Sequence, residues 1–593
     1  MCGINGIVRL RPDAPAIERD ELLRTRDAMT SRGPDGAGAW TSPDGRAALA
    51  SRRLAILDLS PAGAQPMSSP DGRWTLGMNG EIYNFRALRR ELEEQGAVFR
   101  SQSDTEVVLA LLARHGSAAL SRLRGMFGLA LWDDIAKRLL LARDPLGIKP
   151  LYYSTDGGCL RFASQVKALE AGGAVSRAVD PAGLAGFLLW GAVPDPFTIR
   201  SDVRALPAGC FLTVEDGRIG EPERFDRLDA VAIGEPLQPA AAVEDSVAAH
   251  LVSDVPVAVF LSAGLDSGLI AALARRQLPE PPVTFTLTFD ILAGTPKDEG
   301  PLAAEVARTL GTRHVERRVG RADFAGLWPA ALAAMDQPSI DGFNTFVVSR
   351  AAHDAGLKVV LSGLGGDEVF GSYPSFRDVP ALERTARRLG RLPGLAPVWP
   401  GLARLAAADR PKLSGLVRYG SSTAGAYLLR RGLFLPEEVP ALLGREMAEE
   451  GLRRYDPLRA TASVLCDGCP RDPWLDVHRM ETALYMRHQL LRDSDWASMA
   501  WSVELRVPLA DAWLYRHLAA AGFEPAKSRG KAALVRQAAP ELPGALFERP
   551  KTGFYIPVLE WLDPESARLR PGHRSRHLAL RVLAETGIWS RQD

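Results

Sequence analysis

The second residue of the chain is a cysteine whose position would suit a nucleophile. It stands in the run Met1-Cys2-Gly3-Ile4-Asn5-Gly6-Ile7-Val8. Removal of Met1, which a small second residue generally permits, would leave a thiol and a free α-amine on one residue. The amine titrates near about pH 8 and a free thiol near about 8.5, so one residue could supply both nucleophile and base. The alternative is a small, inert residue near a start codon.

A second chemical signal is a pair of turns rich in small and acidic residues. Val257 to Leu261 predicts a strand, and Ser262-Ala263-Gly264-Leu265-Asp266-Ser267-Gly268 predicts a turn that opens a helix. Backbone N–H groups and the positive end of a helix converge at such a turn, where a phosphate would bind. The turn lacks the Gly-Lys-Ser/Thr of a Walker loop, which argues against γ-phosphate transfer of that type.

Another predicted strand leads into Ser362-Gly363-Leu364-Gly365-Gly366-Asp367-Glu368. Carboxyl ends of parallel strands meet at one edge of a sheet, so Asp266 and Asp367 are well placed to hold Mg²⁺ on a pyrophosphate.

The elements that must position Cys2 are predicted to be mainly strands. Gly3 to Val8 indicates a short buried strand, and further apolar runs are bounded by Gly, Asp and Pro. These runs are 75–78, 126–132 and 138–143, and 106–115 predicts a helix. Pro, Gly and acidic residues over 207–240 indicate a linker.

Beyond this linker, strand and helix patterns alternate, which is typical of a parallel α/β sheet. The predicted strands are 255–261, 283–289 and 358–361, and the predicted helices are 266–276 and 301–310. The last third is mainly helical, and the residues from Pro564 onward are Arg-rich with little periodicity.

Composition narrows the class of protein. A chain of 593 residues exceeds what one core supports, and 46% hydrophobic with 24% charged residues is ordinary for a globular protein. A net charge of +1 gives no nucleic-acid signature, and no apolar run is long enough to span a membrane. Five scattered cysteines and no apparent secretory leader favour the cytoplasm. Cys466 and Cys469 form a lone CxxC, for which zinc binding is a minority interpretation.

Six ordered motifs then resemble the glutamine-hydrolysing asparagine synthetases, and the resemblance covers nearly the whole chain. After Cys2-Gly3-Ile4 come Arg32-Gly33-Pro34-Asp35-Gly36, Arg53-Leu54-Ala55-Ile56-Leu57-Asp58, Asn79-Gly80-Glu81-Ile82-Tyr83-Asn84, Ser103-Asp104-Thr105-Glu106 and Arg143-Asp144-Pro145-Leu146-Gly147-Ile148-Lys149-Pro150-Leu151-Tyr152-Tyr153. The family resemblance implies a class II glutaminase domain of the Ntn-type αββα sandwich and a parallel-sheet α/β ATP-pyrophosphatase domain with a helical C-terminal part. The expected bounds are 1–212 for the glutaminase, 213–240 for a linker, 241–570 for the synthetase and 571–593 for an Arg-rich tail.

The resemblance also implies roles for individual residues. Cys2 would attack the glutamine side-chain amide, and Asn79 with the Gly80 N–H would hold the oxyanion. Arg53 would bind the α-carboxylate, and Glu81 and Asp104 would take the α-ammonium or orient its partners. The residues implied in glutamine binding are Arg53, Leu54, Ala55, Ile56, Leu57, Asn79, Gly80, Glu81 and Asp104.

In the second half, the resemblance implies an ATP site and a catalytic Lys531 that neutralises charge at the α-phosphate. The residues implied in ATP binding are Leu261, Ser262, Gly264, Asp266, Ser267, Leu287, Ser362 and Gly363. Asp266 and Asp367 are the implied Mg²⁺ ligands. The implied substrates are glutamine, ATP and a carboxylate acceptor. No nucleic-acid or membrane partner is implied. A homodimer is one oligomeric state that the resemblance leaves open.

Three positions depart from the family pattern. Ala263 and Gly268 replace a usual glycine and a usual serine in the predicted phosphate turn, and Leu364 stands where asparagine synthetases carry a glutamate tied to amide formation. This last departure keeps the acceptor open. The first hypothesis is amidation of aspartate to asparagine. The second keeps the mechanism on another carboxylate, such as a uronic acid, a natural-product acid or a peptide side chain. The third is a degenerate paralogue that binds metabolites or acts as a scaffold.

Overall fold

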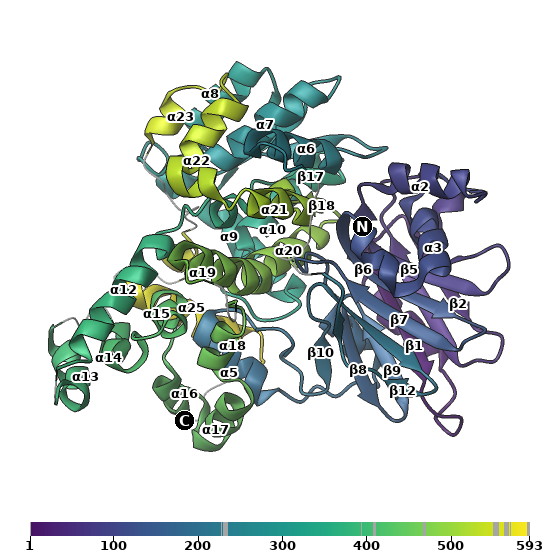
Figure 1. Cartoon of the computed structure of the whole chain (residues 1–593), viewed down its shortest axis with the longest axis horizontal. Coiled ribbons are helices and arrows are strands. Elements are labelled where there is room, and N and C mark those ends of the chain that lie inside the picture. Colours follow the sequence, from purple (N-terminus) through teal and green to yellow (C-terminus); the bar gives the residue numbers. More distant parts are fainter. Residues whose placement is uncertain are drawn as a thin grey trace.

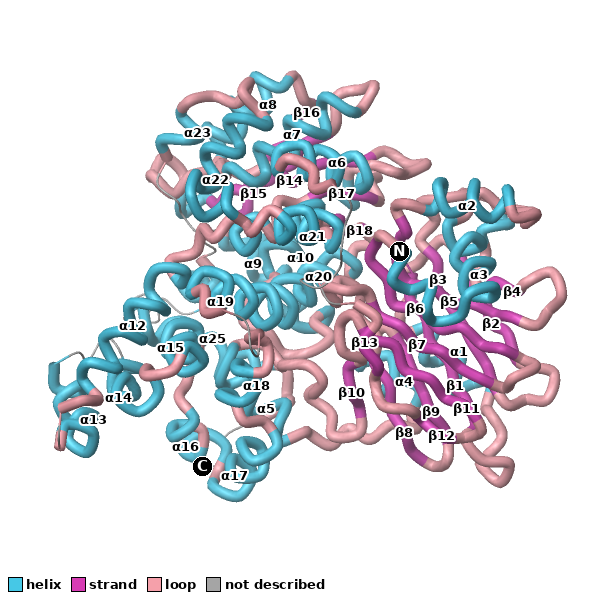
Figure 2. Tube along the Cα trace, viewed as in Figure 1, coloured by secondary structure: helices cyan, strands magenta, loops and turns pink. Residues whose placement is uncertain are grey.

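The computed structural model describes residues 2–226, 228, 235–392, 394–406, 411–466, 470–549, 557–562, 569 and 571–589. Figure 1 shows two bodies side by side, a strand-rich one formed by the N-terminal residues and a larger one dominated by helices. Strands gather in the first body, whereas the strands of the second lie among helices (Figure 2). Within the described residues, no helix is both long and apolar enough to cross a membrane.

The N-terminal body is a sandwich of two antiparallel sheets. The first has the order β10-β8-β9-β1-β3-β2, and the second has the order β12-β11-β7-β6-β5-β4, with β13 paired to β11. The strands of the first are β1 (Cys2–Arg9), β2 (Gly36–Thr41), β3 (Ala47–Arg53), β8 (Tyr152–Asp156), β9 (Cys159–Ala163) and β10 (Val203–Ala205). Those of the second are β4 (Met67–Ser68), β5 (Trp74–Ile82), β6 (Gly125–Asp133), β7 (Arg138–Arg143), β11 (Cys210–Glu215), β12 (Arg218–Ile219) and β13 (Glu223–Arg224).

Alternating apolar residues of both sheets fill the space between them, among them Ile4, Leu49, Trp132 and Leu141. Helices α1 (Arg19–Asp27) and α4 (Val166–Gly172) contact the first sheet, while α3 (Asp104–His115) contacts the second and α2 (Phe85–Glu94) packs on α3. This is the predicted αββα sandwich. The predicted strands and the helix at 106–115 are confirmed within a few residues.

The predicted linker differs from the structure at its beginning. The expected boundary between residues 212 and 213 cuts through β11, which pairs with β7 and buries Leu212 and Val214 in the sandwich core. The Pro and Gly residues nearby belong to turns that lead into and out of a strand. Residues 227 and 229–234 of the expected linker lie outside the described residues.

The second body contains a five-stranded parallel sheet of order β16-β15-β14-β17-β18. Its strands are β14 (Val257–Phe260), β15 (Val283–Phe289), β16 (Arg313–Val319), β17 (Val359–Leu361) and β18 (Glu504–Arg506). Their side chains alternate between two buried clusters, with Val259 on one face and Ala258 and Phe285 on the other. Coverage on both faces explains the continuous apolar runs of the inner strands β14 and β17, whereas the edge strand β16 is largely polar and exposed.

Helices cover both faces of this sheet. Residues of α6 (Pro239–His250), α7 (Leu265–Gln277), α8 (Gly300–Leu310), α21 (Ala512–Ala520) and α22 (Glu524–Ala538) belong to the first cluster. Those of α9 (Arg321–Ala334), α10 (Phe343–Asp354) and α20 (Arg492–Met499) belong to the second. The remaining elements are α5 (Pro181–Trp190), α11 (Gly366–Val369), α12 (Ser375–Leu389), α13 (Leu395–Ala406), α14 (Leu416–Tyr419), α15 (Thr423–Arg431), α16 (Pro440–Leu443), α17 (Arg445–Arg454), α18 (Pro457–Ala462), α19 (Pro473–Met480), the π-helix Glu481–Leu491, α23 (Ala545–Glu548), α24 (Val558–Leu562) and α25 (Pro571–Glu585).

The C-terminal segment is not the irregular tail that its Arg-rich composition suggested. Helix α25 occupies most of it and buries Ala579, Val582 and Leu583 in the second cluster. Arg576 of the same helix forms a bidentate ion pair with Glu438 at 2.8 and 2.9 Å. The arginines therefore lie around a docked helix, and residues 590–593 lie outside the described chain.

Candidate functional site

Cys2 begins β1 and lies at the centre of a buried polar cluster. Its strand is held between β3 and β9, and its side chain is only 5% exposed. The backbone N–H of Cys2 donates to Oδ1 of Asn79 at 3.1 Å. Nε2 of Gln65 donates to the Cys2 sulfur at 3.8 Å. The nucleophile candidate is thus held by a side chain of the second sheet and by one from the loop between β3 and β4.

The expected oxyanion role of Asn79 and Gly80 stays a prediction, and their surroundings are compatible with it. Nδ2 of Asn79 is buried and has no hydrogen-bond acceptor in the described part of the chain. A Cβ added to Gly80 would collide with the carbonyl oxygen of Met126, so only glycine fits between these strands. A buried amide donor beside Cys2 is the kind of group that stabilises a tetrahedral oxyanion.

The residues expected to bind glutamine surround this cysteine. Leu54, Ala55, Ile56 and Leu57 are buried in the segment after β3. Arg53 donates to the carbonyls of Leu57 and Ser60, each at 3.1 Å, and so holds this segment in place. Its expected contact with the glutamine α-carboxylate stays a prediction.

Two buried acids, Glu81 and Asp104, complete the predicted set. Burial raises the pKa of Asp104 to about 6, although its carboxylate accepts the N–H of Ile82 at 2.9 Å. Burial and the nearby charge of Glu504 raise the pKa of Glu81. Burial also raises the pKa of the Cys2 thiol, so its ionisation needs help from a base.

Two contacts of Cys2 were not assigned from the sequence. Gln65 reaches the sulfur and also accepts the N–H of Met78 at 2.7 Å. Arg32 donates to the Cys2 carbonyl at 3.3 Å and forms a bidentate pair with Asp495 at 2.7 and 3.1 Å. Arg32 stands in one of the six motifs, which was a signal for it, but Gln65 carries no such signal.

The second cluster lies where β14 and β17 end. The hydroxyl of Ser267, in the first turn of α7, accepts the N–H of Ser262 at 3.0 Å and lies 2.8 Å from the Ser262 hydroxyl. Gly264 precedes the first residue of α7. The turn therefore closes on itself at a helix N-terminus, as expected for a phosphate-binding turn.

The second predicted turn packs directly on the first. A Cβ on Gly363 would lie 2.8 Å from the backbone nitrogen of Ser267, and one on Gly366 would collide with the Asp266 carboxylate. Gly365 has a φ of 95°, which favours glycine. Ser362 and Gly363 therefore lie beside the turn at 262–268, whose binding of phosphate stays a prediction, and Leu261 and Leu287 are buried.

Lys531 connects the two turns. Its ammonium donates to Asp266 at 2.6 Å and also to Asp367. Burial opposes the charge, but the two carboxylates hold the pKa of Lys531 above its ordinary value. Gly530, with a φ of 69°, breaks α22 immediately before Lys531 and redirects the chain there. Residues about 265 positions apart in sequence thus meet at one point.

An apolar region joins the two clusters. Leu54, Tyr83 and Met126 of the sandwich belong to the same buried cluster as Val259 and Leu261, which lead into the phosphate turn. In Figure 1 the end of the sandwich that holds the N-terminus faces β17 and β18. Polar contacts flank this region, since Arg506 of β18 lies 3.7 Å from Glu81.

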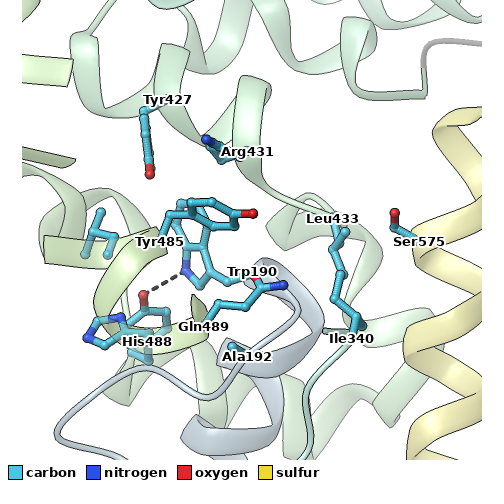
Figure 3. Close-up of a pocket in the computed structure, with 12 residues that line it drawn as sticks. Trp190, Ala192, Ile340, Tyr427, Arg431, Leu433, Tyr485, His488, Gln489 and Ser575 are labelled. Atoms are coloured by element: carbon cyan, nitrogen blue, oxygen red, sulfur yellow. Dashed lines mark hydrogen bonds between the residues drawn. The ribbon is translucent and has the colours of Figure 1, made fainter. Parts of the chain in front are cut away.

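A cavity of about 190 Å³ lies in the helical part of the second body. Its lining includes Trp190, Tyr427, Arg431, Tyr485 and Gln489, whose side chains surround a common space in Figure 3. The Arg431 guanidinium lies 3.9 Å from the ring centroid of Tyr485 and pairs with Glu481 at 2.8 Å. The cavity therefore has a wall of aromatic and aliphatic side chains and an anchored guanidinium.

Comparisons with known proteins find a matching domain family for each half of the chain. Residues 1–225 match the glutamine amidotransferase domain model, and residues 239–584 match the asparagine synthase model. A protein of Mycobacterium bovis named as a putative glutamine-hydrolysing asparagine synthetase is 32% identical over 95% of this chain and 88% of its own length.

Other relatives carry related but not identical names. Asparagine synthetase 1 of Bacillus subtilis is 31% identical over 95% of this chain and 88% of its own. A protein of Gibberella zeae named amidase chry2 is 30% identical over 64% of this chain and 60% of its own. With a family model that spans more than half of the chain, and with relatives that cover nearly all of it, the chain belongs to the glutamine-hydrolysing asparagine synthetase family of ligases.

Proposed function

We propose that this protein amidates a carboxylate with nitrogen from glutamine and energy from ATP, most simply aspartate to asparagine. The observation that carries the proposal is the pair of built sites in one chain. Cys2 lies beside the Asn79 amide, and Lys531 lies between Asp266 and Asp367 above a closed phosphate turn. These intact constellations argue against a degenerate scaffold paralogue.

In the first half-reaction, the Cys2 thiolate attacks the glutamine side-chain amide carbon. The α-amine of a processed terminus would take the thiol proton, and Asn79 Nδ2 with the Gly80 N–H would receive the oxyanion. Ammonia leaves, and water hydrolyses the thioester to glutamate. Asp104 and Glu81 would receive the α-ammonium, and Arg53 would receive the α-carboxylate.

In the second half-reaction, the acceptor carboxylate attacks the α-phosphorus of ATP and pyrophosphate leaves. Lys531 would neutralise charge at the α-phosphate, while Ser262, Gly264 and Ser267 would hold the pyrophosphate. Asp266 and Asp367 suit Mg²⁺, which takes one or two carboxylates together with phosphate oxygens and would supply charge neutralisation there. Ammonia then displaces AMP from the acyl-adenylate.

The ammonia must reach the second site unprotonated. The apolar cluster that joins Leu54, Tyr83 and Met126 to Leu261 supports transfer through an enclosed path between the halves. Bulk water would protonate most free ammonia at neutral pH.

A different acceptor is the second candidate. Leu364 is half-buried and packs on the apolar cluster beside Asp367, where it can neither take a proton nor pair with an ammonium. Next to Asp367, Glu368 accepts the Tyr373 hydroxyl at 3.0 Å, and the Tyr373 ring stacks under Arg431 of the aromatic cavity. This arrangement supports a larger carboxylate whose body extends toward the cavity in Figure 3. Aspartate-stimulated release of pyrophosphate distinguishes the two candidates.

The proposal is tested by Cys2→Ala. This variant should lose glutamine-dependent synthesis by at least about a thousandfold, because it removes the thiol beside Asn79, while ammonium salts still support pyrophosphate release. Cys159→Ala, which removes another buried free cysteine, is the control and should keep both activities. Glutamine use by Cys2→Ala at the wild-type rate would refute the nucleophile assignment.

The cytoplasmic location and the homodimer stay predictions.

A further inference from the structure

Two neighbouring cavities lie between the two bodies, and residues of the π-helix Glu481–Leu491 line both. The first has a volume of about 420 Å³. Its walls include Pro196 and Phe197 from the N-terminal half and Tyr455, the residue that follows α17. The second has a volume of about 560 Å³ and reaches Tyr515 and Phe523. We call them the interdomain cavities. Both volumes lie in the range of small-molecule sites.

Two arginines, Arg224 of β13 and Arg487 of the π-helix, line both interdomain cavities. Neither forms an ion pair with any described residue. Arg487 instead donates through Nε to the carbonyl of Leu146 at 3.2 Å, which leaves its other N–H groups for a ligand. Arg459 of α18 adds a third cation to the first cavity and likewise has no ion pair in the described chain.

The acidic residues in the walls of these cavities already bind other groups of the protein, either arginines or backbone N–H groups. Asp195 lies between Arg143 and Arg492, at 2.9 and 2.6 Å. Asp226 pairs with Arg516. Asp456 caps α18 by accepting the N–H of Leu458 at 2.9 Å. The cavities therefore have an excess of positive charge.

Burial makes the positive charge of Arg487 costly, whereas Arg224 is exposed. Burial, with the positive charges of Arg143 and Arg224 nearby, lowers the pKa of Arg487 to about 10 despite the opposing effect of Asp195. Burial also lowers the pKa of His478 to about 4 and that of His488 to about 3, so both line the cavities as neutral groups at pH 7. A buried guanidinium without a counter-charge is unfavourable, and an anion would remove that penalty.

We propose that Arg224 and Arg487 bind a small anionic metabolite, one that carries phosphate or carboxylate groups, in the interdomain cavities. The planar guanidinium fork matches the geometry of both groups. None of the lining residues belongs to the proposed glutamine or ATP sites, so this is a separate site, and it does not rest on the amidation chemistry.

The ligand would bridge the two halves. Arg224 belongs to the last strand of the sandwich, whereas Arg487 belongs to the π-helix that leads into α20. Asp495 of α20 in turn holds Arg32, which contacts the Cys2 carbonyl. Binding should therefore stabilise the contact between the halves and raise the melting temperature of the whole chain.

The test is thermal unfolding of the full chain at pH 7 during titration with inorganic phosphate and, separately, with citrate. Sodium chloride at matched ionic strength controls for screening, and Arg445→Gln, a surface arginine paired with Glu449, controls for loss of one charge. We expect a saturable rise in melting temperature with at least one of the two anions. Arg224→Gln and Arg487→Gln should each weaken the apparent affinity at least tenfold, while Arg445→Gln should not.

The response to phosphate and citrate distinguishes a phosphate ligand from a carboxylate ligand. Arg224 is exposed, so Arg224→Gln should fold normally even if Arg487→Gln proves unstable. An equal response in wild type and both cavity variants would place the anion elsewhere, such as at the phosphate turn, and would overturn the proposal. A response no larger than that to sodium chloride would overturn it too.

Discussion

Burial shifts the pKa values of Cys2 and of the acidic residues around it. It raises the pKa of the thiol and of the Glu81 and Asp104 carboxyls, so each favours its neutral form more than it would in water. A compensating positive charge would therefore favour the ionised form of these acids. The ammonium of glutamine would supply that charge for the acids, which makes their ionisation part of substrate binding.

Asp104 gives a pH prediction. Its pKa is about 6 in the folded protein, above the value of about 3.9 for an unfolded chain. The folded state therefore holds this proton more tightly, and the stability contributed by this group falls as pH rises between those values. Below about pH 6 the neutral carboxyl would bind the glutamine ammonium less well.

We expect the KM for glutamine to rise several-fold from pH 7.5 to pH 5.5, measured as glutamate release. Asp104→Asn should have a high KM at both pH values. Asp134→Asn, a change at a partly buried acid that pairs with Lys137, is the control and should behave as wild type. A wild-type KM that is flat over this range would contradict the role of Asp104.

At the scale of elements, the synthetase site depends on the close packing of two turns. Gly363 permits the turn after β17 to approach the backbone of Ser267 and Asp266. Because the nearest atoms belong to backbone, they have little freedom to move away from an added methyl group. The turn at 262–268 and the turn that carries Asp367 therefore form one packed unit.

Gly363→Ala should lower ATP-dependent pyrophosphate release at least tenfold, which corresponds to about 1.4 kcal/mol, and should leave glutaminase activity unchanged. The added Cβ would lie 2.8 Å from the Ser267 nitrogen, so the turn must shift. Gly326→Ala, where no atom lies within 4 Å of the new Cβ, is the control. Full synthetase activity in Gly363→Ala would show that the packing of the turns is not required.

Sequence patterns predicted the helices and strands well, but they did not predict how elements pack on partners that are distant in the sequence. Strand β15 coincides with its prediction at 283–289, and α7 and α8 agree within a residue, because apolar runs and turn residues mark them locally. The sequence did not indicate that β11 continues the sandwich or that α25 is a docked helix, because both depend on partners far away in the chain.

The candidate site shows the same division. Motifs led to Cys2, Asn79 and Asp266, since their chemistry depends on residue type and local turns. Gln65 was missed because a glutamine in a loop has no distinctive pattern, although it lies 3.8 Å from the Cys2 sulfur. The bridge from Arg32 to Asp495 spans 463 positions, and only the folded chain brings the two together.

At the scale of the whole molecule, buried ion pairs hold the two halves together. Asp495 of α20 pairs with Arg32 and lies 3.5 Å from Lys149, and all three side chains are at most 4% exposed. Burial alone would raise the pKa of Asp495, but the two cations lower it below its ordinary value. The contribution of this carboxylate to stability is therefore present at neutral pH and lost as pH falls below about 4.

Asp495→Asn should lower the free energy of unfolding by about 3–5 kcal/mol, because it leaves two buried cations without a counter-charge. Glu449→Gln, which breaks a surface pair with Arg445, should cost about 0–1 kcal/mol. Urea denaturation at pH 7 measures both changes. A loss below about 1 kcal/mol for Asp495→Asn would contradict the view that this contact fixes the halves.

The central claim is that one chain moves the amide nitrogen of glutamine onto a carboxylate activated by ATP. The most direct measurement follows ¹⁵N from the side chain of labelled glutamine in a reaction with ATP, Mg²⁺ and aspartate, and in parallel reactions with other carboxylic acids. We predict a labelled amide with one AMP and one pyrophosphate formed for each amide. Formation of ADP and phosphate instead, or ATP consumption without a labelled amide from any acid, would contradict the claim.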